Sequence, residues 1–176
     1  MLKSEKMDFF DLIATRHSIR AYKQKNLSKD IIRKILNASQ KAPSAGNIQS
    51  YQIFVVSKED VKKRLAKAAH DQNYIIEASL VFVFCADPQN SAKEYGTRGI
   101  ELFSIQDATL ACAYAQLASH ALGLSSVWIG AFNENEVKTI LNIGVLRPVA
   151  MLVVGFANEK PEITNRRPLE EIIHEI

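Results

Sequence analysis

The segment from residue 102 to residue 122 constrains the fold more than any other part of the chain. Asp107 is its only formally charged residue at neutral pH, and apolar or small side chains occupy most of the other positions. A helix that is apolar nearly all round has no solvent face, so it must be covered on every side. Gly123 follows as a suitable C-terminal helix cap. The sequence therefore predicts a buried helix.

Two environments are able to cover such a helix. A bilayer accepts a span of about 20 apolar residues. However, polar side chains such as Gln106, Gln116 and His120 are spread along the segment and argue against a membrane. A chain of 176 residues has little other structure with which to wrap the helix. A second subunit is the simplest additional cover, so we expect a homo-oligomer and no membrane span.

Shorter strands and helices are expected on both sides of this helix. Continuous or alternating apolar runs of strand length predict the strands, and capping residues and turn signals delimit the helices. The polar composition of residues 89–99 predicts a mobile surface segment that covers a site. The expected strands are 51–56, 80–86, 126–131 and 149–156, and the expected helices are a turn or two at 8–15, then 29–41, 57–70 and 133–142.

Composition excludes several classes of function. The chain has 47% hydrophobic and 23% charged residues, as is ordinary for a soluble globular protein. Its first residues lack the apolar core of a secretory signal, so the cytoplasm is expected. A net charge of +3 without a basic face does not indicate nucleic acid. Cys85 and Cys112 are expected to be buried, inert thiols, and the four histidines lack metal-ligand spacing.

Arginines are concentrated near both ends of the chain. If residues 16–20 are extended, alternation points Arg16, Ser18 and Arg20 to one side. Two guanidinium groups and a hydroxyl form a suitable cradle for an anion, because the planar fork of arginine matches phosphate oxygens. A solvated basic loop is the alternative interpretation. Arg166 and Arg167 form a second cluster in the C-terminal tail.

Other features favour a cofactor that brings its own reactivity. Residues 43–49 are rich in turn formers and small hydrogen-bonding groups, although a simple connecting loop is the alternative. A strand ends at Gly130, where a ligand is able to approach the backbone. The chain has no G-x-S-x-G nucleophile elbow, no P-loop and no G-x-G-x-x-G motif after a strand. These features suit a phosphorylated cofactor better than a protein nucleophile.

Seven motifs follow one another in an order that is specific when taken together. They are R-H-S-I-R, A-P-S-A-G-N-I-Q, E-A-S-L-V-F-V-F-C-A-D-P, Q-D-A-T-L-A, A-L-G-L-S-S-V-W-I-G-A-F, R-P-V-A-M-L-V-V-G-F and R-R-P-L-E-E. A chain with these motifs over more than three quarters of its length resembles the nitroreductase family of FMN-dependent oxidoreductases. The resemblance implies an α+β fold, with a mostly antiparallel central sheet flanked by helices, as a single FMN-binding domain over residues 1–176. It also implies an intertwined homodimer in which the C-terminal segment crosses to the partner, with two FMN sites at the interface.

The activity implied by the resemblance is hydride transfer. NADH or NADPH would reduce FMN at N5, and the flavin would then reduce a nitro compound, a quinone or a related unsaturated acceptor by a ping-pong mechanism. FMN carries this chemistry, so neither a catalytic side chain nor a metal is expected. The alternatives are a non-catalytic flavin-binding or redox-sensor protein, and a family member with dehalogenase, enone-reductase or flavin-fragmenting activity.

The resemblance also assigns contacts at the phosphate end of FMN. Arg16 and Ser18 are expected to hold the phosphate and the ribityl chain, and Arg20 to lie near the pyrimidine edge of the flavin. Arg166 and Arg167 are expected to close on the phosphate. Many relatives have Lys where this chain has Asn165, which bears on phosphate affinity, and Pro-Trp at positions 50 and 51, which bear on the pocket wall.

The remaining contacts concern the ring system. Gly130 and Ala131 are expected to present backbone N–H groups toward flavin N5 and O4, and Gln72 or Asn73 to reach the O2/N3 edge. Ser44, Ala45 and Asn47 would come from the other subunit, with Asn47 contacting the ring or ribityl. The complete set of expected cofactor-binding residues is Arg16, His17, Ser18, Arg20, Pro43, Ser44, Ala45, Asn47, Gln72, Trp128, Ile129, Gly130, Ala131, Arg166 and Arg167.

Overall fold

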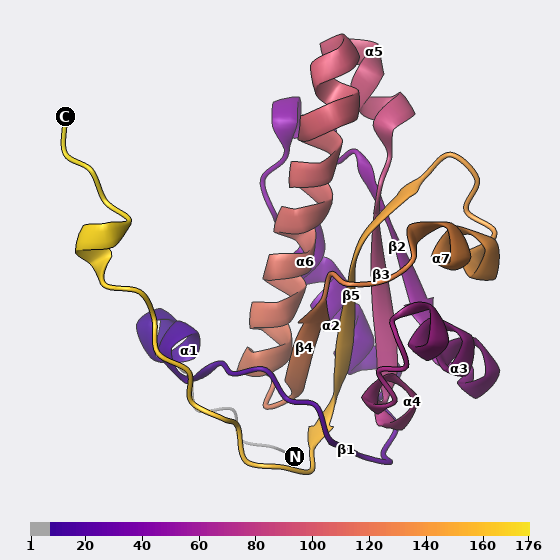
Figure 1. Ribbon diagram of the computed structural model, residues 1–176, viewed down its shortest axis with the longest axis vertical. Helices are drawn as coiled ribbons and strands as arrows, with labels where there is room; N and C mark the ends of the chain where they lie inside the picture. Colours follow the sequence, from indigo (N-terminus) through magenta and orange to yellow (C-terminus); the bar gives the residue numbers. More distant parts are fainter. Residues whose placement is uncertain (1–7) are drawn as a thin grey trace.

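Five strands form an antiparallel sheet in the computed structural model, which describes residues 8–176 (Figure 1). The longest strand, β5 (Arg147–Ala157), pairs with β3 (Leu80–Ala86) on one side and with β4 (Ser125–Ile129) on the other. Beyond β3 lies β2 (Tyr51–Val56), and the two-residue β1 (Tyr22–Lys23) pairs with the end of β5. The predicted α+β fold with a mostly antiparallel sheet is confirmed.

Helices cover both faces of this sheet (Figure 1). One face packs against α2 (Lys29–Gln40) and α6 (Ser104–Ala121), and the other against α3 (Glu59–Ala68), α4 (Tyr74–Glu77) and α7 (Glu134–Leu141). The remaining elements are α1 (Phe9–Thr15), a 3-10 turn at Ala45–Asn47, α5 (Pro88–Arg98), a π-helical turn at Gly99–Phe103 that leads into α6, and a 3-10 turn at Leu169–Glu171.

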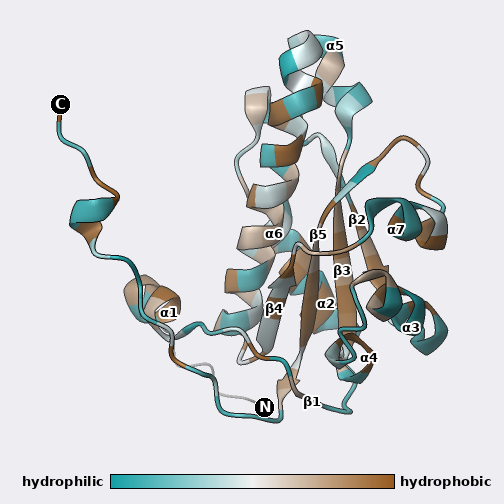
Figure 2. Ribbon diagram, viewed as in Figure 1, coloured by the Kyte–Doolittle hydropathy of each residue, from teal (hydrophilic) through white to brown (hydrophobic). Residues whose placement is uncertain are grey.

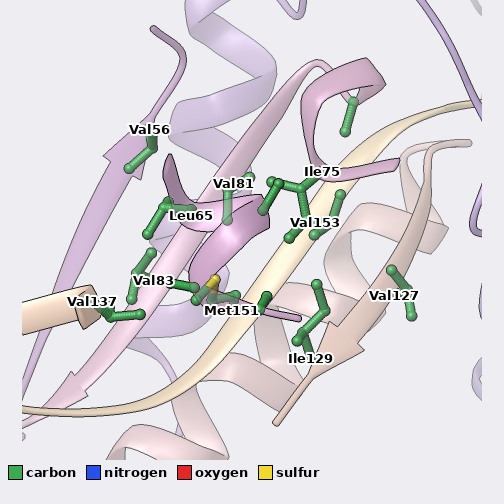
Figure 3. Close-up of a cluster of buried hydrophobic side chains, with 14 of the residues drawn as sticks. Val56, Leu65, Ile75, Val81, Val83, Val127, Ile129, Val137, Met151 and Val153 are labelled. Carbon is green, nitrogen blue, oxygen red and sulfur yellow. The ribbon is translucent and has the colours of Figure 1, made fainter. Parts of the chain in front are cut away.

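Strand β3 shows why the sheet needs helices on both faces. Its alternate residues Leu80 and Phe82 join the cluster beneath α2 and α6, whereas Val81 and Val83 join the cluster beneath α3 and α4 (Figure 3). Every residue of β3 is buried, as predicted for a central strand. Figure 2 shows β3 and most of β5, the central strands of the sheet, as hydrophobic. Burial of each large apolar side chain contributes roughly 1.5–3 kcal/mol, so this double core fixes the register of the sheet.

The sequence did not predict α5 or β1. Residues 89–99, for which a mobile surface segment is predicted, lie mostly in α5, a surface helix with a kink at Gly96, whose φ is 51°; the mobility of this segment stays a prediction. The polar composition that suggested mobility belongs to the outer side of this helix. Strand β1 was not predicted, because two residues give no periodic pattern. Cys85 and Cys112 are buried, as expected.

Helix α6 is covered by its own chain on one side only. Asp107, Ala111 and Ala115 are buried, whereas Leu110 and Tyr114 are 38% and 40% exposed. The sequence therefore predicted the position of the helix, but the single chain leaves part of its apolar surface uncovered. Among the described helices, none has the length and apolar character needed to cross a bilayer.

The C-terminal tail leaves the body of the molecule. After β5, the chain runs beside α1 and then away from the sheet (Figure 1). Every residue from 158 to 176 is exposed, and the tail includes large apolar side chains such as Ile163, Leu169 and Ile172. This tail therefore has apolar surface that the chain alone does not bury.

Candidate functional site

The residues from 16 to 20, here called the arginine segment, are held in an extended conformation beside β4. Ser18 forms a parallel bridge with Ser126, and the Ile19 N–H donates to the Ser126 carbonyl at 3.2 Å. The buried Tyr22 hydroxyl donates to the Ile19 carbonyl at 2.6 Å. Ile19 is buried, while Arg20 is exposed. These contacts turn the polar side chains of the segment outward.

A cleft of about 880 Å³ lies between this segment, α1 and the tail. We call it the arginine cleft, because Arg16 and Arg20 line one side and Arg166 lines the other. His17 and Ser18 also line it, so all four predicted site residues of the segment lie at the cleft. Arg167 does not line the cleft; its guanidinium group donates to Glu171 at 3.1 Å instead. Residues 10–20 and the first part of the C-terminal tail, residues 159–166, thus meet at one site.

The electrostatics of this cleft favour an anion. Burial, and secondly the positive charge of Arg166, lower the pKa of Arg16. Within residues 8–176, neither Arg16 nor Arg166 has a carboxylate at ion-pair distance. Two neighbouring guanidinium groups repel one another unless an anion lies between them. Glu159 and Glu162 line another part of the cleft, and Glu159 accepts the backbone N–H of Arg20.

His120 borders the same region from the end of α6. Its Nε2 atom lies 3.0 Å from the Thr15 hydroxyl oxygen. Burial, and then the positive charge of Arg16, lower the pKa of His120. Both effects favour the neutral form of the ring, and His120 was not among the predicted site residues.

A second group of predicted residues lies in the loop from residue 43 to residue 50, here called the 43–50 loop. Pro43, Ser44 and Ala45 line a separate cavity of about 460 Å³, together with Phe103 and Leu110. The lining residues of this cavity and those of the arginine cleft do not overlap. Asn47 is exposed and has a φ of 58°. Within one chain, the predicted set is therefore divided between two places.

A short chain of contacts connects the arginine segment with the end of β4. The Gln72 side-chain amide donates to the Ala69 carbonyl at 2.7 Å and to the Ala131 carbonyl at 3.4 Å. The Tyr74 hydroxyl donates to Gln72. Arg20 lies next to Tyr74; burial raises the pKa of Tyr74, and the Arg20 charge opposes this shift. Gln72 thus lies between the two regions, and Tyr74 is a neighbour that the sequence did not reveal; contact of Gln72 with the flavin stays a prediction.

The last predicted group lies around the end of β4. Gly130 and Ala131 are exposed, so their backbone is accessible to a ligand. Trp128 packs against the core beneath α2 and α6, and Ile129 is buried on the opposite face of the sheet. The side chains of Trp128 and Ile129 therefore belong to the core, and only their backbone is available at this edge.

Comparison with known proteins agrees with this fold and arrangement. Residues 13–156 match the nitroreductase family. A relative from Archaeoglobus fulgidus named "Putative NADH dehydrogenase/NAD(P)H nitroreductase" is 36% identical over 125 residues, covering 71% of this chain and 68% of the relative. A Staphylococcus aureus NADPH-dependent oxidoreductase is 25% identical over 182 residues, covering 94% and 72%. The structure of NfrA1 nitroreductase from B. subtilis has a TM-score of 0.88 and 27% identity, covering 96% and 74%. The chain therefore belongs to the nitroreductase family of enzymes.

Proposed function

We propose that this protein is an NAD(P)H-dependent FMN oxidoreductase whose two flavin sites are shared between the subunits of a homodimer. Its acceptor is a nitro compound, a quinone or a related unsaturated compound. The observation that carries the proposal is the arginine cleft, where Arg16 and Arg166 converge from distant parts of the chain and neither pairs with a carboxylate of residues 8–176. The names of the relatives support a nicotinamide reductant.

The residues in the cleft fit the phosphate end of FMN. Guanidinium groups bind phosphate through paired N–H donors, and the Ser18 hydroxyl adds another donor beside them. The cleft of about 880 Å³ falls within the range of small-molecule and cofactor sites, roughly 300–1,000 Å³. Arg16 and Arg166 thus hold the phosphate in this proposal, and Ser18 orients it.

The residues between the cleft and β4 fit the flavin ring. Arg20 places a positive charge at the pyrimidine edge, where it stabilises negative charge that develops on the ring and raises the reduction potential. Gln72 and the backbone of Gly130 and Ala131 orient the ring. When bound, the flavin supplies the redox chemistry by taking a hydride from the nicotinamide and passing it to the acceptor. We assign the side chains to binding and orientation, and none of them to a covalent step.

A second copy of the chain supplies the remaining contacts. The 43–50 loop does not reach the arginine cleft of its own chain, so its predicted role requires the loop of a partner. The exposed apolar side chains of Leu110 and Tyr114 support a subunit interface along α6, next to this loop. The exposed apolar residues of the tail, including Ile163 and Leu169, support its exchange between subunits.

Anaerobic spectroscopy tests the proposal. Purified protein is saturated with FMN and mixed with NADH or with NADPH, and the flavin absorbance is recorded before and after adding acceptors of each class. We expect reductant to bleach the absorbance and a nitro compound or quinone to restore it. A halogenated phenol and an enone test the other activities of the family.

Each outcome separates this function from its alternatives. Bound FMN that responds to neither nicotinamide contradicts the enzyme and favours a non-catalytic flavin protein or redox sensor. A protein that takes up no FMN contradicts both. A variant that lacks both cleft arginines, Arg16→Ala with Arg166→Ala, should lose FMN binding, whereas Arg33→Ala, which removes an exposed arginine of α2 away from the cleft, should keep it.

A further inference from the structure

The single charge of helix α6 is buried and bound to the 43–50 loop. Asp107 is 2% exposed. One of its carboxylate oxygens accepts the Ala45 N–H at 2.9 Å, and the other accepts the Ser50 N–H at 3.1 Å. In the described part of the chain, no cation forms an ion pair with this carboxylate. A buried charge is unfavourable unless hydrogen bonds satisfy it, so Asp107 depends on the loop amides.

The 43–50 loop has an unfavourable backbone conformation that contacts from outside the loop must stabilise. Gly46, Asn47 and Gln49 have φ values of 53°, 58° and 54°. Left-handed conformations are unfavourable for residues other than glycine, and they persist only when the surrounding structure enforces them. The Ser44 hydroxyl accepts the Gln49 N–H at 3.1 Å within the loop.

Asp107 holds the loop at both ends. Its two hydrogen bonds reach Ala45, before the left-handed residues, and Ser50, directly after them. One rigid group therefore sets the distance between the two ends of the strained turn. Because α6 packs directly on the sheet, the position of the loop is coupled to the core.

We propose that Asp107 is a positioning residue for the flavin site: its carboxylate presets the 43–50 loop and thereby sets the affinity of the site to which the loop contributes. This inference rests on the proposed function, because Ser44, Ala45 and Asn47 are residues that the loop presents to FMN. Asp107 acts through the loop amides, since both of its carboxylate oxygens are engaged by them.

The sharpest test is Asp107→Asn, which keeps the shape of the side chain. An amide retains one acceptor oxygen, but it places an N–H donor opposite the other loop N–H. Loss of a hydrogen bond to a charged group is worth roughly a tenfold to hundredfold change in an equilibrium. We expect FMN affinity, measured by flavin fluorescence, to fall by about tenfold or more, and amide exchange of Ala45 or Ser50 in the apoprotein to accelerate by a similar factor.

The matched control is Ser119→Ala, which changes a buried polar side chain of the same helix. The Ser119 hydroxyl donates only to the Ala115 carbonyl within α6, at 2.8 Å. A merely structural role for Asp107 predicts that both variants lower the melting temperature and that neither changes FMN affinity or loop exchange. The proposal predicts that only Asp107→Asn changes them.

If Asp107→Asn does not fold, Ala45→Pro replaces it. Proline removes one amide donor and leaves the carboxylate intact, and Ser44 already has a ψ of 158°, which suits a residue before proline. We again expect weaker FMN binding and faster exchange at Ser50. Wild-type affinity in whichever variant folds overturns this inference alone, whereas a wild-type protein that takes up no FMN overturns the proposed function as well.

Discussion

The arginine cleft and the 43–50 loop differ in how their charged groups are satisfied: the cleft has charges without a partner in the described chain, whereas the loop contacts a carboxylate whose hydrogen bonds are made. In the cleft, Arg16 and Arg166 lie near one another, neither has a carboxylate at ion-pair distance within residues 8–176, and the lining residues of the tail are exposed. In the loop, a buried carboxylate satisfies two amides and fixes three left-handed residues. The cleft therefore gains stability when an anion binds, whereas the loop is already organised. We infer that the charges of the cleft contribute the larger share of the ligand affinity and that the preset loop contributes a smaller share.

Removing the positive charges of the cleft should have the largest effect of the substitutions considered, and it should act on FMN affinity. A hydrogen bond to a charged group is worth about 1.5–3 kcal/mol, so Arg16→Ala combined with Arg166→Ala should weaken FMN binding by roughly 1,000-fold. Fluorescence titration at low and high salt measures this change. The wild-type affinity should also fall with salt more steeply than that of the variant. An unchanged affinity in the double variant would show that the cleft is not the phosphate site.

Adding a single methyl group at Gly46 of the loop should lower the free energy of unfolding. A Cβ added at Gly46 would overlap the Tyr95 hydroxyl, whereas a Cβ at Gly144 would meet no atom within 4 Å. Both glycines have positive φ, at 53° and 56°, so Gly144→Ala measures the conformational penalty alone, about 1–2 kcal/mol. We expect Gly46→Ala to lower the free energy of unfolding by about 1 kcal/mol more, as overpacking does.

Denaturant unfolding measures both glycine variants. Tyr95→Phe in the Gly46→Ala background removes the overlapping hydroxyl, and we expect it to recover part of the lost stability. Equal destabilisation by the two glycine substitutions would contradict a tightly packed loop.

A smaller effect is expected on the pH dependence of stability, through His120 at the edge of the cleft. The pKa of His120 is lower in the folded protein than its usual value of 6.5, because of burial and the Arg16 charge. Protonation therefore favours the unfolded chain: stability is kept above pH 6.5 and is lost as the pH falls through the folded-state pKa. We expect the melting temperature of His120→Gln to fall less between pH 7 and pH 5 than that of the wild type.

The matched control for this pH effect is His174→Gln in the exposed tail. This variant should follow the wild-type pH dependence, because it leaves His120 in place. Identical pH dependence in wild type and His120→Gln would contradict the role of His120.

The sequence predicted the core elements well because their signals are local. Strands β2 and β3 begin and end at the predicted residues. In β3 the continuous apolar run coincides with burial of every residue, whereas β2 lies at the sheet edge and is only partly buried. Helix α5 was missed because its polar residues and Gly96 resemble a loop. Strand β1 exists only through its pairing with β5, and no local pattern encodes a contact between residues so far apart.

Part of the candidate site could also be predicted, because some of its residues lie close together in the sequence and give a local signal. Residue type and alternation indicated that Arg16, Ser18 and Arg20 form an anion cradle, but only the fold brings Arg166 to them. Tyr74 was missed because its contact with Gln72 and Arg20 depends on tertiary packing. A signal for the role of Asp107 was present, since a lone charge in an apolar helix needs a buried partner.

A mixed dimer tests most directly whether two chains share each site. One chain carries Arg16→Ala, and the other carries Asn47→Gly, which removes the loop side chain and keeps its left-handed conformation available. If each site combines the cleft of one subunit with the loop of the other, both substitutions fall in the same site of the mixed dimer. The second site then combines a wild-type cleft with a wild-type loop. We predict that the mixed dimer binds FMN at half of its sites with wild-type affinity, while both parent homodimers bind weakly. Weak binding at every site of the mixed dimer would contradict the shared site.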